Sequence, residues 1–360
     1  AVTVAALATG CGAVNESPEA LAALGREIDV AGSIAGAGAS SQAAAMEVWI
    51  AGFSALAPDA TVTYDPSGSG AGRDQFLAGG VAFAGSDAPL DVEELPQAQQ
   101  RCGGADNLIQ IPVYVSPIAV VYNLDGVEDL RLSAPTIAKI FTGRITTWND
   151  PAIAAENPGV ALPDLPITPV HRSDESGTTE NFTEYLAAAA GPDWPYEPNG
   201  DWPIPGGEAA QGTAGVVAVV QAGHGTIGYV DASQAGSLGT VAVKVGDHYV
   251  EPTPDAAAAI VEASPRTPGA GRFDFAVQLD RDTTQAGTYP IVLVSYGLAC
   301  TTYPDATTAE VTKAFLDYLV SPEGQQSAAQ LAGNAPISPT QRERFQQAVN
   351  AIAATPPRAG

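Results

Sequence analysis

Residues 171–179, His-Arg-Ser-Asp-Glu-Ser-Gly-Thr-Thr, form the densest group of anion-binding residue types in the chain. Ser176 to Thr178 put hydroxyls and a small residue at a predicted helix start, where the first backbone N–H groups have no partners and can hold an anion. Arg172 adds a planar cation that can bind two oxygens at once. Asp174 is placed to hold that guanidinium in position. This stretch therefore predicts an anion-binding site.

An ordinary structural explanation also exists for these residues. Serine and threonine before a helix are commonly only caps, and an arginine near an aspartate is commonly a surface pair. The anion-site hypothesis gains support because the same order of strand, Gly/Ser turn and helix start occurs twice more. Ser40 and Ser41 precede residues 46–53, whose apolar spacing predicts a helix, and Ser69 lies in the glycine-rich turn of residues 67–72.

A carboxylate is predicted at a similar position. The predicted strand Val81–Ala84 leads into Gly-Ser-Asp87-Ala-Pro, so that Asp87 lies at the carboxyl end of a strand, where open α/β sheets place ligand contacts. The glycine patterns do not indicate a nucleotide. Gly68-x-Gly70-x-Gly72 has the wrong spacing and lacks the P-loop lysine, and the glycines of residues 223–228 precede a strand instead of following one.

Alternating strands and helices must position these groups. The apolar run Leu162–Val170 predicts the strand that leads to Arg172, and the segments Gln110–Asn123 and Tyr289–Ser295 predict two crossovers between domains. Residues 250–285, rich in Pro, Ala, Asp and Arg, predict an irregular segment. A chain of 360 residues is long enough for two domains. The alternation favours an α/β fold with mainly parallel sheets flanked by helices.

Composition excludes some classes of partner. The formal net charge is −25, from 15 basic and 40 acidic residues, and the sequence contains no basic cluster. A protein that binds nucleic acid or an anionic membrane normally has a basic face, so we expect neither partner. An anionic ligand would have to be held by local hydrogen bonds against an unfavourable long-range field. The site must therefore be enclosed and preorganised.

The first residues resemble the end of a secretory signal. Residues 1–10 are uncharged, small and apolar, and too few to span a bilayer. Leu7-Ala-Thr-Gly-Cys11 resembles a bacterial lipobox, with Leu7 one residue further from the cysteine than is usual. We expect Cys11 to be acylated and residues 1–27 to be a signal remnant and tether, the alternative being an ordinary disordered terminus.

The remaining cysteines are Cys102 and Cys300. An exported chain lives in an oxidising compartment, so a disulfide between them is expected, and the alternative is a pair of buried thiols. Cys-x-x-Cys and Cys/His ligand spacings are absent from the sequence, and the histidines are scattered. We therefore expect no structural zinc and no cofactor.

Several motifs, matching in order and spacing, resemble those of the phosphate-binding proteins of bacterial ABC-type high-affinity phosphate importers. The resemblance spans residues 30–350, and it implies a two-domain periplasmic-binding-protein fold, of the Venus-flytrap type, with two hinge crossovers. The motifs are Gly36-Ala-Gly-Ala-Ser40, Gly68-Ser-Gly70, Gly85-Ser-Asp-Ala-Pro-Leu90, Ile140-Phe-Thr-Gly-Arg-Ile-Thr-Thr-Trp148, Asn149-Asp-Pro-Ala-Ile153, Arg172-Ser-Asp-Glu-Ser-Gly-Thr178 and Gly225-Thr-Ile-Gly-Tyr-Val230. We expect residues 28–114 with 291–354 to form domain I, 115–290 to form domain II, and 355–360 to be a tail.

The resemblance also implies the ligand and its contacts. Ser41 stands where the family often has phenylalanine and is expected to contribute its backbone N–H, and Asp174 is expected to support the arginine. The implied phosphate ligands are Ser40, Ser41, Ser69, Asp87, Arg172, Ser176, Gly177 and Thr178. Asp87, an ionised acceptor, would need a hydrogen from the ligand, which hydrogen phosphate and dihydrogen phosphate supply near neutral pH and sulfate does not.

The implied protein is therefore not an enzyme. It would be a monomeric, extracytoplasmic binding protein, periplasmic or held at the outer face of the cell membrane only through its lipid anchor, that delivers phosphate to an ABC permease. Another oxyanion as ligand, a structural or adhesive surface protein, and a phosphoester hydrolase are the alternatives. In the hydrolase Ser176 or Ser69 would be the nucleophile, His171 the base and Asp174 the orienting group. Against it, GxSxG is absent and His171 is expected to point away from Arg172.

Overall fold

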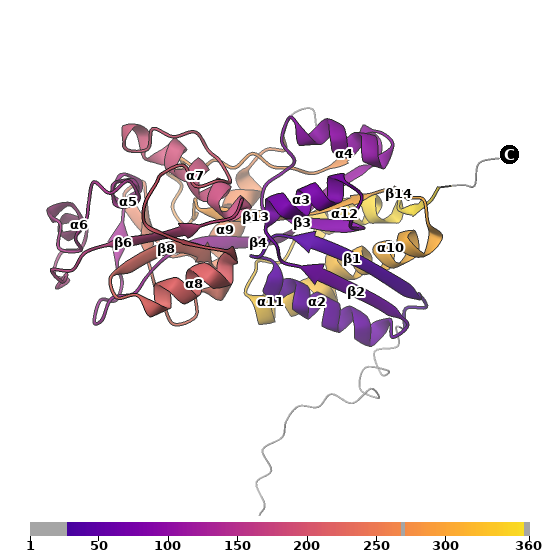
Figure 1. The fold of residues 1–360 in the computed structure, drawn as a ribbon, viewed down its shortest axis with the longest axis horizontal. Helices are drawn as coiled ribbons and strands as arrows, with labels where there is room; N and C mark the ends of the chain where they lie inside the picture. Colours follow the sequence, from indigo (N-terminus) through magenta and orange to yellow (C-terminus); the bar gives the residue numbers. More distant parts are fainter. Residues whose placement is uncertain (1–26, 268–270, 356–360) are drawn as a thin grey trace, which may run out of the picture.

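The computed structural model describes residues 27–267 and 271–355. Figure 1 shows two lobes side by side, joined by long strands that run through the middle of the molecule. The strands are β1 (Gly32–Gly38), β2 (Ala60–Asp65), β3 (Phe83–Ser86), β4 (Leu108–Tyr122), β5 (Arg131–Leu132), β6 (Thr168–Arg172), β7 (Glu208–Ala210), β8 (Thr226–Asp231), β9 (Gly239–Thr240), β10 (Ala242–Val245), β11 (His248–Val250), β12 (Phe273–Asp274), β13 (Val292–Cys300), β14 (Thr302–Tyr303) and β15 (Ala353–Ala354).

The helices flank these strands in both lobes (Figure 1). They are α2 (Ala43–Leu56), α3 (Ser69–Leu77), α4 (Glu94–Cys102), α5 (Ala134–Phe141), α6 (Pro151–Glu156), α7 (Gly177–Ala189), α8 (Gly212–Ala222), α9 (Pro254–Ala263), α10 (Ala306–Val320), α11 (Pro322–Ala332) and α12 (Pro339–Asn350), with short 3-10 turns η1 (Ala105–Asn107), η2 (Gly191–Asp193) and η3 (Ala232–Gln234). Lobe I denotes β1–β3 with α2–α4 and α10–α12. Lobe II denotes β6–β8 with α5–α8 and η3.

One continuous sheet path crosses both lobes in the order β2-β1-β3-β13-β4-β8-β6-β7. Pairs inside each lobe, such as β1 with β2 and β3 or β6 with β7 and β8, are parallel. The two predicted crossovers are β4 and β13, which pair antiparallel with each other and with their lobe neighbours β8 and β3. The α/β class and the two crossovers are thus confirmed, and the crossovers join the parallel strands of the two lobes into one sheet.

The crossover strands are apolar because they are covered on both faces. Every residue of β4 and of β13 is buried, as expected for a central strand between two layers of helices. In lobe I, α3 and α10 pack on β1 while α2 packs against α11; in lobe II, α8 packs on β6 and β8. The carboxyl ends of β1, β3 and β6 are consequently fixed near the boundary between the lobes (Figure 1).

Two local expectations were wrong. The strand leading to Arg172 begins at Thr168 rather than Leu162, and the part of the run before it contains two prolines, Pro163 and Pro166, which disfavour a longer strand. The segment of residues 250–285 is not wholly irregular, since it contains α9. That helix begins with Thr253, whose side chain accepts a hydrogen bond from Ala256 N, followed by a proline in the first turn.

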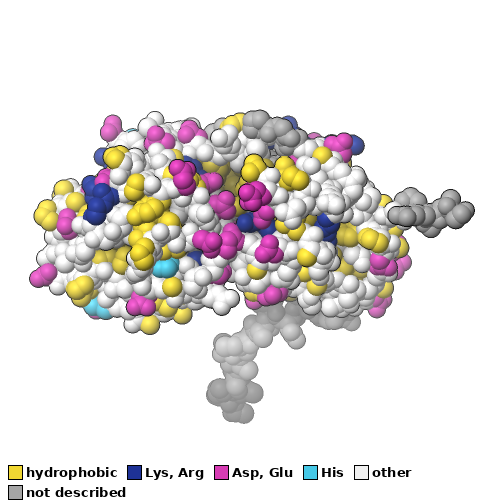
Figure 2. Space-filling view, turned by 45° about the horizontal axis from the view of Figure 1, so that its top comes forward, with side chains coloured by type: hydrophobic (Ala, Val, Ile, Leu, Met, Phe, Trp, Pro, Cys, Tyr) yellow, Lys and Arg dark blue, Asp and Glu magenta, His cyan; other side chains and the backbone are white. Residues whose placement is uncertain are grey.

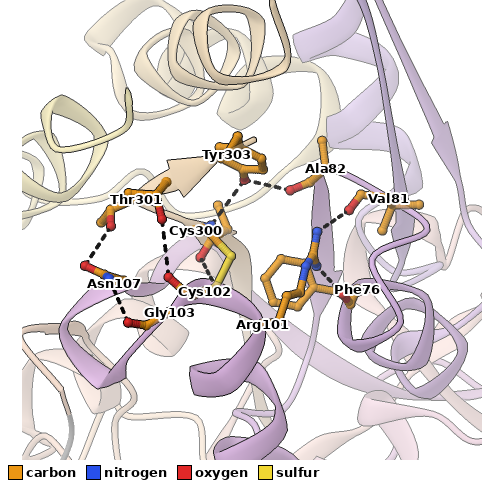
Figure 3. The surroundings of a disulfide bond; sticks show 12 residues. Phe76, Val81, Ala82, Arg101, Cys102, Gly103, Asn107, Cys300, Thr301 and Tyr303 are labelled. Atoms are coloured by element: carbon orange, nitrogen blue, oxygen red, sulfur yellow. Dashed lines mark hydrogen bonds between the residues drawn. A yellow bond between two sulfur atoms is a disulfide. The ribbon is translucent and has the colours of Figure 1, made fainter. Parts of the chain in front are cut away.

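A disulfide joins Cys102, the last residue of α4, to Cys300, the last residue of β13 (Figure 3). Beside it, the guanidinium of Arg101 lies over the ring of Phe76 and donates to the carbonyl oxygens of Phe76 and Val81. The disulfide therefore ties α4, which follows the Asp87 turn, to the last residue of the crossover strand β13.

Cys11 and its tether up to residue 26, and residues 356–360 of the tail, lie outside the described residues.

Neither a membrane span nor a metal centre is found in the part of the chain that the structure describes. Within residues 27–267 and 271–355, every helix is too short or too polar to cross a bilayer. In the same ranges, His, Cys, Asp and Glu side chains do not gather into a group of three or more that could hold a metal ion.

Candidate functional site

Three chain turns meet at the boundary between the lobes, each between a strand and a helix. The turn at Ser40 and Ser41 joins β1 to α2, the turn at Gly68 joins β2 to α3, and the turn from Ser173 to Ser176 joins β6 to α7. Ala39 N donates to Gly85 O and Gly68 N donates to Gly38 O, so that the lobe I turns are bonded to one another. Helix N-termini thus converge where anions are favoured.

Asp87 lies at the centre of this arrangement, one residue beyond β3 and only 3% exposed. Its carboxylate accepts hydrogen bonds from three hydroxyls. Ser41 Oγ lies 2.8 Å from Oδ1 and 2.6 Å from Oδ2, Ser295 Oγ lies 2.6 Å from Oδ1, and Thr178 Oγ1 lies 3.1 Å from Oδ2. Its backbone N–H donates to Ser69 Oγ at 3.2 Å. The lobe I candidates Ser41, Ser69 and Asp87 are therefore in direct contact.

The electrostatics of Asp87 are a balance of opposed effects. Burial raises the pKa of the Asp87 carboxyl above its ordinary value, because desolvation disfavours the charged form. The hydrogen bonds from Ser295, Ser41 and Thr178, and the charge of Arg172, act to lower the pKa. The hydroxyl donors therefore favour the ionised, hydrogen-bond-accepting form.

Arg172 is the buried cation of the site, 3% exposed at the end of β6. Asp174 binds it in a fork, with Nε donating to Oδ1 at 2.8 Å and Nη2 donating to Oδ2. Asp174 Oδ1 also accepts from Gly212 N at 3.0 Å, which fixes it to the start of α8. Burial acts to raise the pKa of Asp174, but the hydrogen bonds and the charge of Arg172 outweigh this effect and hold the pKa below its ordinary value. Asp174 therefore binds the guanidinium through both of its carboxylate oxygens.

The start of α7 packs closely against Asp87. Ser176 caps the helix by accepting from Thr179 N at 3.3 Å, and Thr178 reaches across to the carboxylate. A Cβ on Gly177 would lie 2.6 Å from Asp87 Cβ and 2.9 Å from Ser69 Oγ, so a larger residue has no room there. Gly177 therefore allows the amide end of α7 to approach the lobe I turns closely.

Ser40 makes a separate contact between the lobes. Its Oγ accepts from Thr213 N at 3.1 Å, at the start of α8, and lies 3.2 Å from Thr213 Oγ1. Its backbone carbonyl and that of Ser41 both accept from Gln234 Nε2, at 3.3 and 2.9 Å. Ser40 thus contacts lobe II, while its neighbour Ser41 contacts Asp87.

An ion pair also links the lobes. Arg73 of α3 donates from Nη2 to Glu175 Oε1 at 3.0 Å and from Nε to Glu94 Oε1 at 2.7 Å. These side chains line an open hollow of about 580 Å³ between the lobes. Figure 2 shows acidic side chains gathered around this boundary with dark blue basic ones among them. A second hollow of about 690 Å³ reaches Asp87 from the side of Arg281 and Tyr296.

Some contacts of the site were missed by sequence reasoning. Ser295 was assigned only to a crossover, and neither Thr213 nor the hydroxyl of Ser41 was given a role. A single serine in the apolar run Ile291–Gly297 is a signal that could have identified Ser295. Thr213 has no such signal, because its contact depends on how the lobes meet.

His171 does not take part in the cluster. Its ring stacks on Trp202, with centroids 5.1 Å apart, and its nitrogens lie 2.9 Å from Arg172 O and 3.1 Å from Gly206 O. Neighbouring residues of a strand point to opposite faces, so His171 is directed away from the Arg172 guanidinium. The arrangement required for a Ser–His–Asp hydrolase, with His171 as base, is not formed.

Comparison with known proteins places these features in a family. Residues 26–323 match the model of the PBP superfamily domain. The chain is 37% identical to phosphate-binding protein PstS 3 of Mycobacterium leprae, covering 97% of this chain and 96% of the relative. It is also 37% identical to phosphate-binding protein PstS 2 of Mycobacterium tuberculosis, covering 88% and 86%.

Solved structures show the same fold. A phosphate-binding protein from Stenotrophomonas maltophilia superposes with a TM-score of 0.71 at 21% identity, covering 88% of this chain and 94% of the other. A high-affinity periplasmic phosphate-binding protein with phosphate bound gives a TM-score of 0.70 at 23% identity, covering 88% and 93%. Together with the two-lobed fold and its crossovers, these likenesses show that the chain belongs to the PBP superfamily and, within it, to the family of PstS phosphate-binding proteins.

Proposed function

We propose that this protein captures inorganic phosphate between its lobes and delivers it to an ABC permease. The observation that carries the proposal is the environment of Asp87, a buried carboxylate that meets three hydroxyl donors where the start of α7 approaches the lobe I turns. Relatives named as PstS phosphate-binding proteins support phosphate as the ligand.

The proposed ligand groups are those expected from the sequence: Ser40, Ser41, Ser69, Asp87, Arg172, Ser176, Gly177 and Thr178. The hydroxyls of Ser40, Ser69 and Ser176, the helix-start N–H groups and the guanidinium donate to the ligand oxygens, and Arg172 supplies the charge that a dianion requires. Ser41 and Thr178, whose hydroxyls donate to Asp87, contribute their backbone N–H groups. The proposed role of Asp174 is to keep the Arg172 fork in one orientation.

Asp87 is proposed to discriminate between phosphate and sulfate. A carboxylate offers about four lone-pair positions, and the hydroxyls of Ser41, Ser295 and Thr178 occupy three of them. One position is left for an O–H of the ligand. Phosphate carries a hydrogen near neutral pH and donates it, whereas sulfate would place two acceptors face to face in a buried site. Sites of this kind reject the analogue without the hydrogen by roughly 10⁴ to 10⁵.

Binding is proposed to involve closure of two domains, residues 28–114 with 291–354 and residues 115–290, about the crossovers β4 and β13. Direct contacts between the lobes, such as Ser40 with Thr213 and Arg73 with Glu175, favour the closed arrangement. The closed form is the one that a permease would recognise, and reopening would release the ligand. We expect the protein to act as an extracytoplasmic monomer, anchored through Cys11 if that residue is acylated.

Calorimetric titration of ligand-stripped protein with phosphate, arsenate and sulfate tests the proposal. We expect saturable binding of phosphate and of arsenate, which also carries a hydrogen, and rejection of sulfate at neutral pH. Equal affinity for sulfate would remove the discriminating role of Asp87 and favour a general oxyanion binder. Turnover of a chromogenic phosphoester by the purified protein would instead favour a hydrolase.

A further inference from the structure

Ser295 lies beside Asp87, just past the last pair of β13 with β3. Strand β13 pairs antiparallel with β3, with Tyr296 opposite Ser86, and Ser295 and Asp87 are the residues that follow this pair. The side chain of Ser295 is fully buried, and its Oγ lies 2.6 Å from Asp87 Oδ1. A crossover strand thus supplies a hydroxyl to the carboxylate that is proposed to test the ligand.

Gln42 fixes the direction of that hydroxyl. Gln42 directly precedes α2, is fully buried, and donates from Nε2 to Ser295 Oγ. An ionised carboxylate can only accept, and a side-chain NH₂ group can only donate. Ser295 must therefore use its oxygen for Gln42 and its hydrogen for Asp87. The chain of donors runs from Gln42 to Ser295 to Asp87.

Few charged groups face Asp87 from the surrounding elements. Ser41 and Ser69 approach from the starts of α2 and α3, Thr178 from α7 and Ser295 from β13. Arg172 of β6 is the charge that acts to stabilise the carboxylate, and Tyr64 of β2 has a raised pKa, because it is buried and near Asp87, and stays neutral. The ionised state of Asp87 consequently depends on its hydroxyl donors and on the charge of Arg172.

We propose that Ser295, oriented by Gln42, is a positioning residue for selectivity: it keeps Asp87 in the accepting form, so that the site tests its ligand for a hydrogen. This inference rests on the proposed function, because it assumes that Asp87 faces the anion. Without the Ser295 hydroxyl, Asp87 takes up a proton at higher pH and becomes a donor. A protonated Asp87 no longer rejects sulfate.

Sulfate affinity measured from pH 5 to pH 9 tests this inference, because sulfate itself does not titrate in that range. We expect the Ser295→Ala variant to bind sulfate up to a pH about one to two units higher than the wild type does, since loss of one hydrogen bond to a charged group shifts a pKa by about that much. Ser295→Thr, which keeps the hydroxyl, should follow the wild-type profile. Ser116→Ala, which removes a buried hydroxyl from the other crossover, is the matched control.

Two further variants separate the possible failures. If Asp87→Asn gains sulfate affinity at all pH values but Ser295→Ala has the wild-type profile, the role of Ser295 is wrong and the role of Asp87 stands. If Asp87→Asn changes nothing, or the wild type binds no phosphate, the proposed function itself fails. If Ser295→Ala does not fold, Gln42→Met removes the orienting donor and should shift the profile the same way by less than about one unit; an unshifted profile overturns the inference.

Discussion

Thr178 of lobe II donates a hydrogen bond to Asp87 of lobe I, with 3.1 Å between Oγ1 and Oδ2. This contact joins the amide end of α7 to the carboxylate that follows β3. The proposed ligand-binding groups and the contacts that hold the lobes together are thus the same atoms or their neighbours. Affinity and closure should therefore change together when these residues are altered.

Arg172 should be the main source of phosphate affinity. Arg172→Met removes a buried cation and leaves Asp174 without its partner, and we expect phosphate affinity to fall by about 2–5 kcal/mol, roughly 30-fold to several thousand-fold. Arg144→Met makes the same change of net charge at an exposed side chain paired with Asp193. Calorimetry should show near-wild-type affinity for that control. An equal loss in both variants would mean that long-range charge, rather than the fork at the site, holds the anion.

The ion pair between Arg73 and Glu175 should slow the release of phosphate. Arg73 is 7% exposed and joins α3 to the turn before α7, so the pair exists only when the lobes are together. In Glu175→Gln we expect a phosphate dissociation rate about 2- to 10-fold faster, with a smaller change in association rate. Asp193→Asn, which breaks pairs with Lys139 and Arg144 inside lobe II, is the control. Stopped-flow rates that match in the two variants would contradict the assignment.

Glu180 should make stability depend on pH. Burial, together with Glu184, Glu175 and Glu94 and against the charge of Arg73, raises the pKa of Glu180 to about 7. The folded state then binds more protons than the unfolded state between about pH 4.5 and 7. Its free energy of unfolding therefore falls as pH rises through this window, and the full loss of stability is present above about pH 7. Glu180→Gln removes this loss, because glutamine does not ionise.

We expect this variant to be more stable than the wild type by about 1–3 kcal/mol at pH 8, and equal to it at pH 4. Thermal unfolding at the two pH values measures the difference. If the difference in stability between the two proteins is the same at pH 4 and pH 8, ionisation of the buried Glu180 carboxyl does not cause the pH dependence.

The disulfide should contribute stability without affecting the site. Cys102 and Cys300 are 198 residues apart in sequence, so the bond constrains a large loop of the unfolded chain. Replacing both by alanine should lower the free energy of unfolding by about 2–4 kcal/mol, measured by denaturant titration, and leave phosphate affinity within about twofold. Reduction of the wild type should reproduce the effect. A large loss of affinity would show that α4 helps to hold the Asp87 turn.

The parts predicted from the sequence are those set by local patterns. Gly/Ser turns before amphipathic helices, Asp87 at a strand end and the apolar crossovers all have signals within a few residues. Thr213, Ser295 and the pair of Arg73 with Glu175 depend instead on contacts between distant segments. Nothing near Arg73 indicates Glu175, because only the meeting of the two lobes brings them together. The helix α9 was missed for a different reason, since composition was given more weight than its Thr-Pro start.

The ratio of phosphate to sulfate affinity in the wild type and in Asp87→Asn is the most direct measure of the central claim. Both anions are titrated at neutral pH into ligand-stripped protein. We predict that the wild type prefers phosphate by roughly 10⁴ or more and that the asparagine, which can donate to sulfate, lowers this ratio at least about 100-fold. A ratio that is the same in the two proteins would contradict the account, because Asp87 would then not test the ligand for its hydrogen.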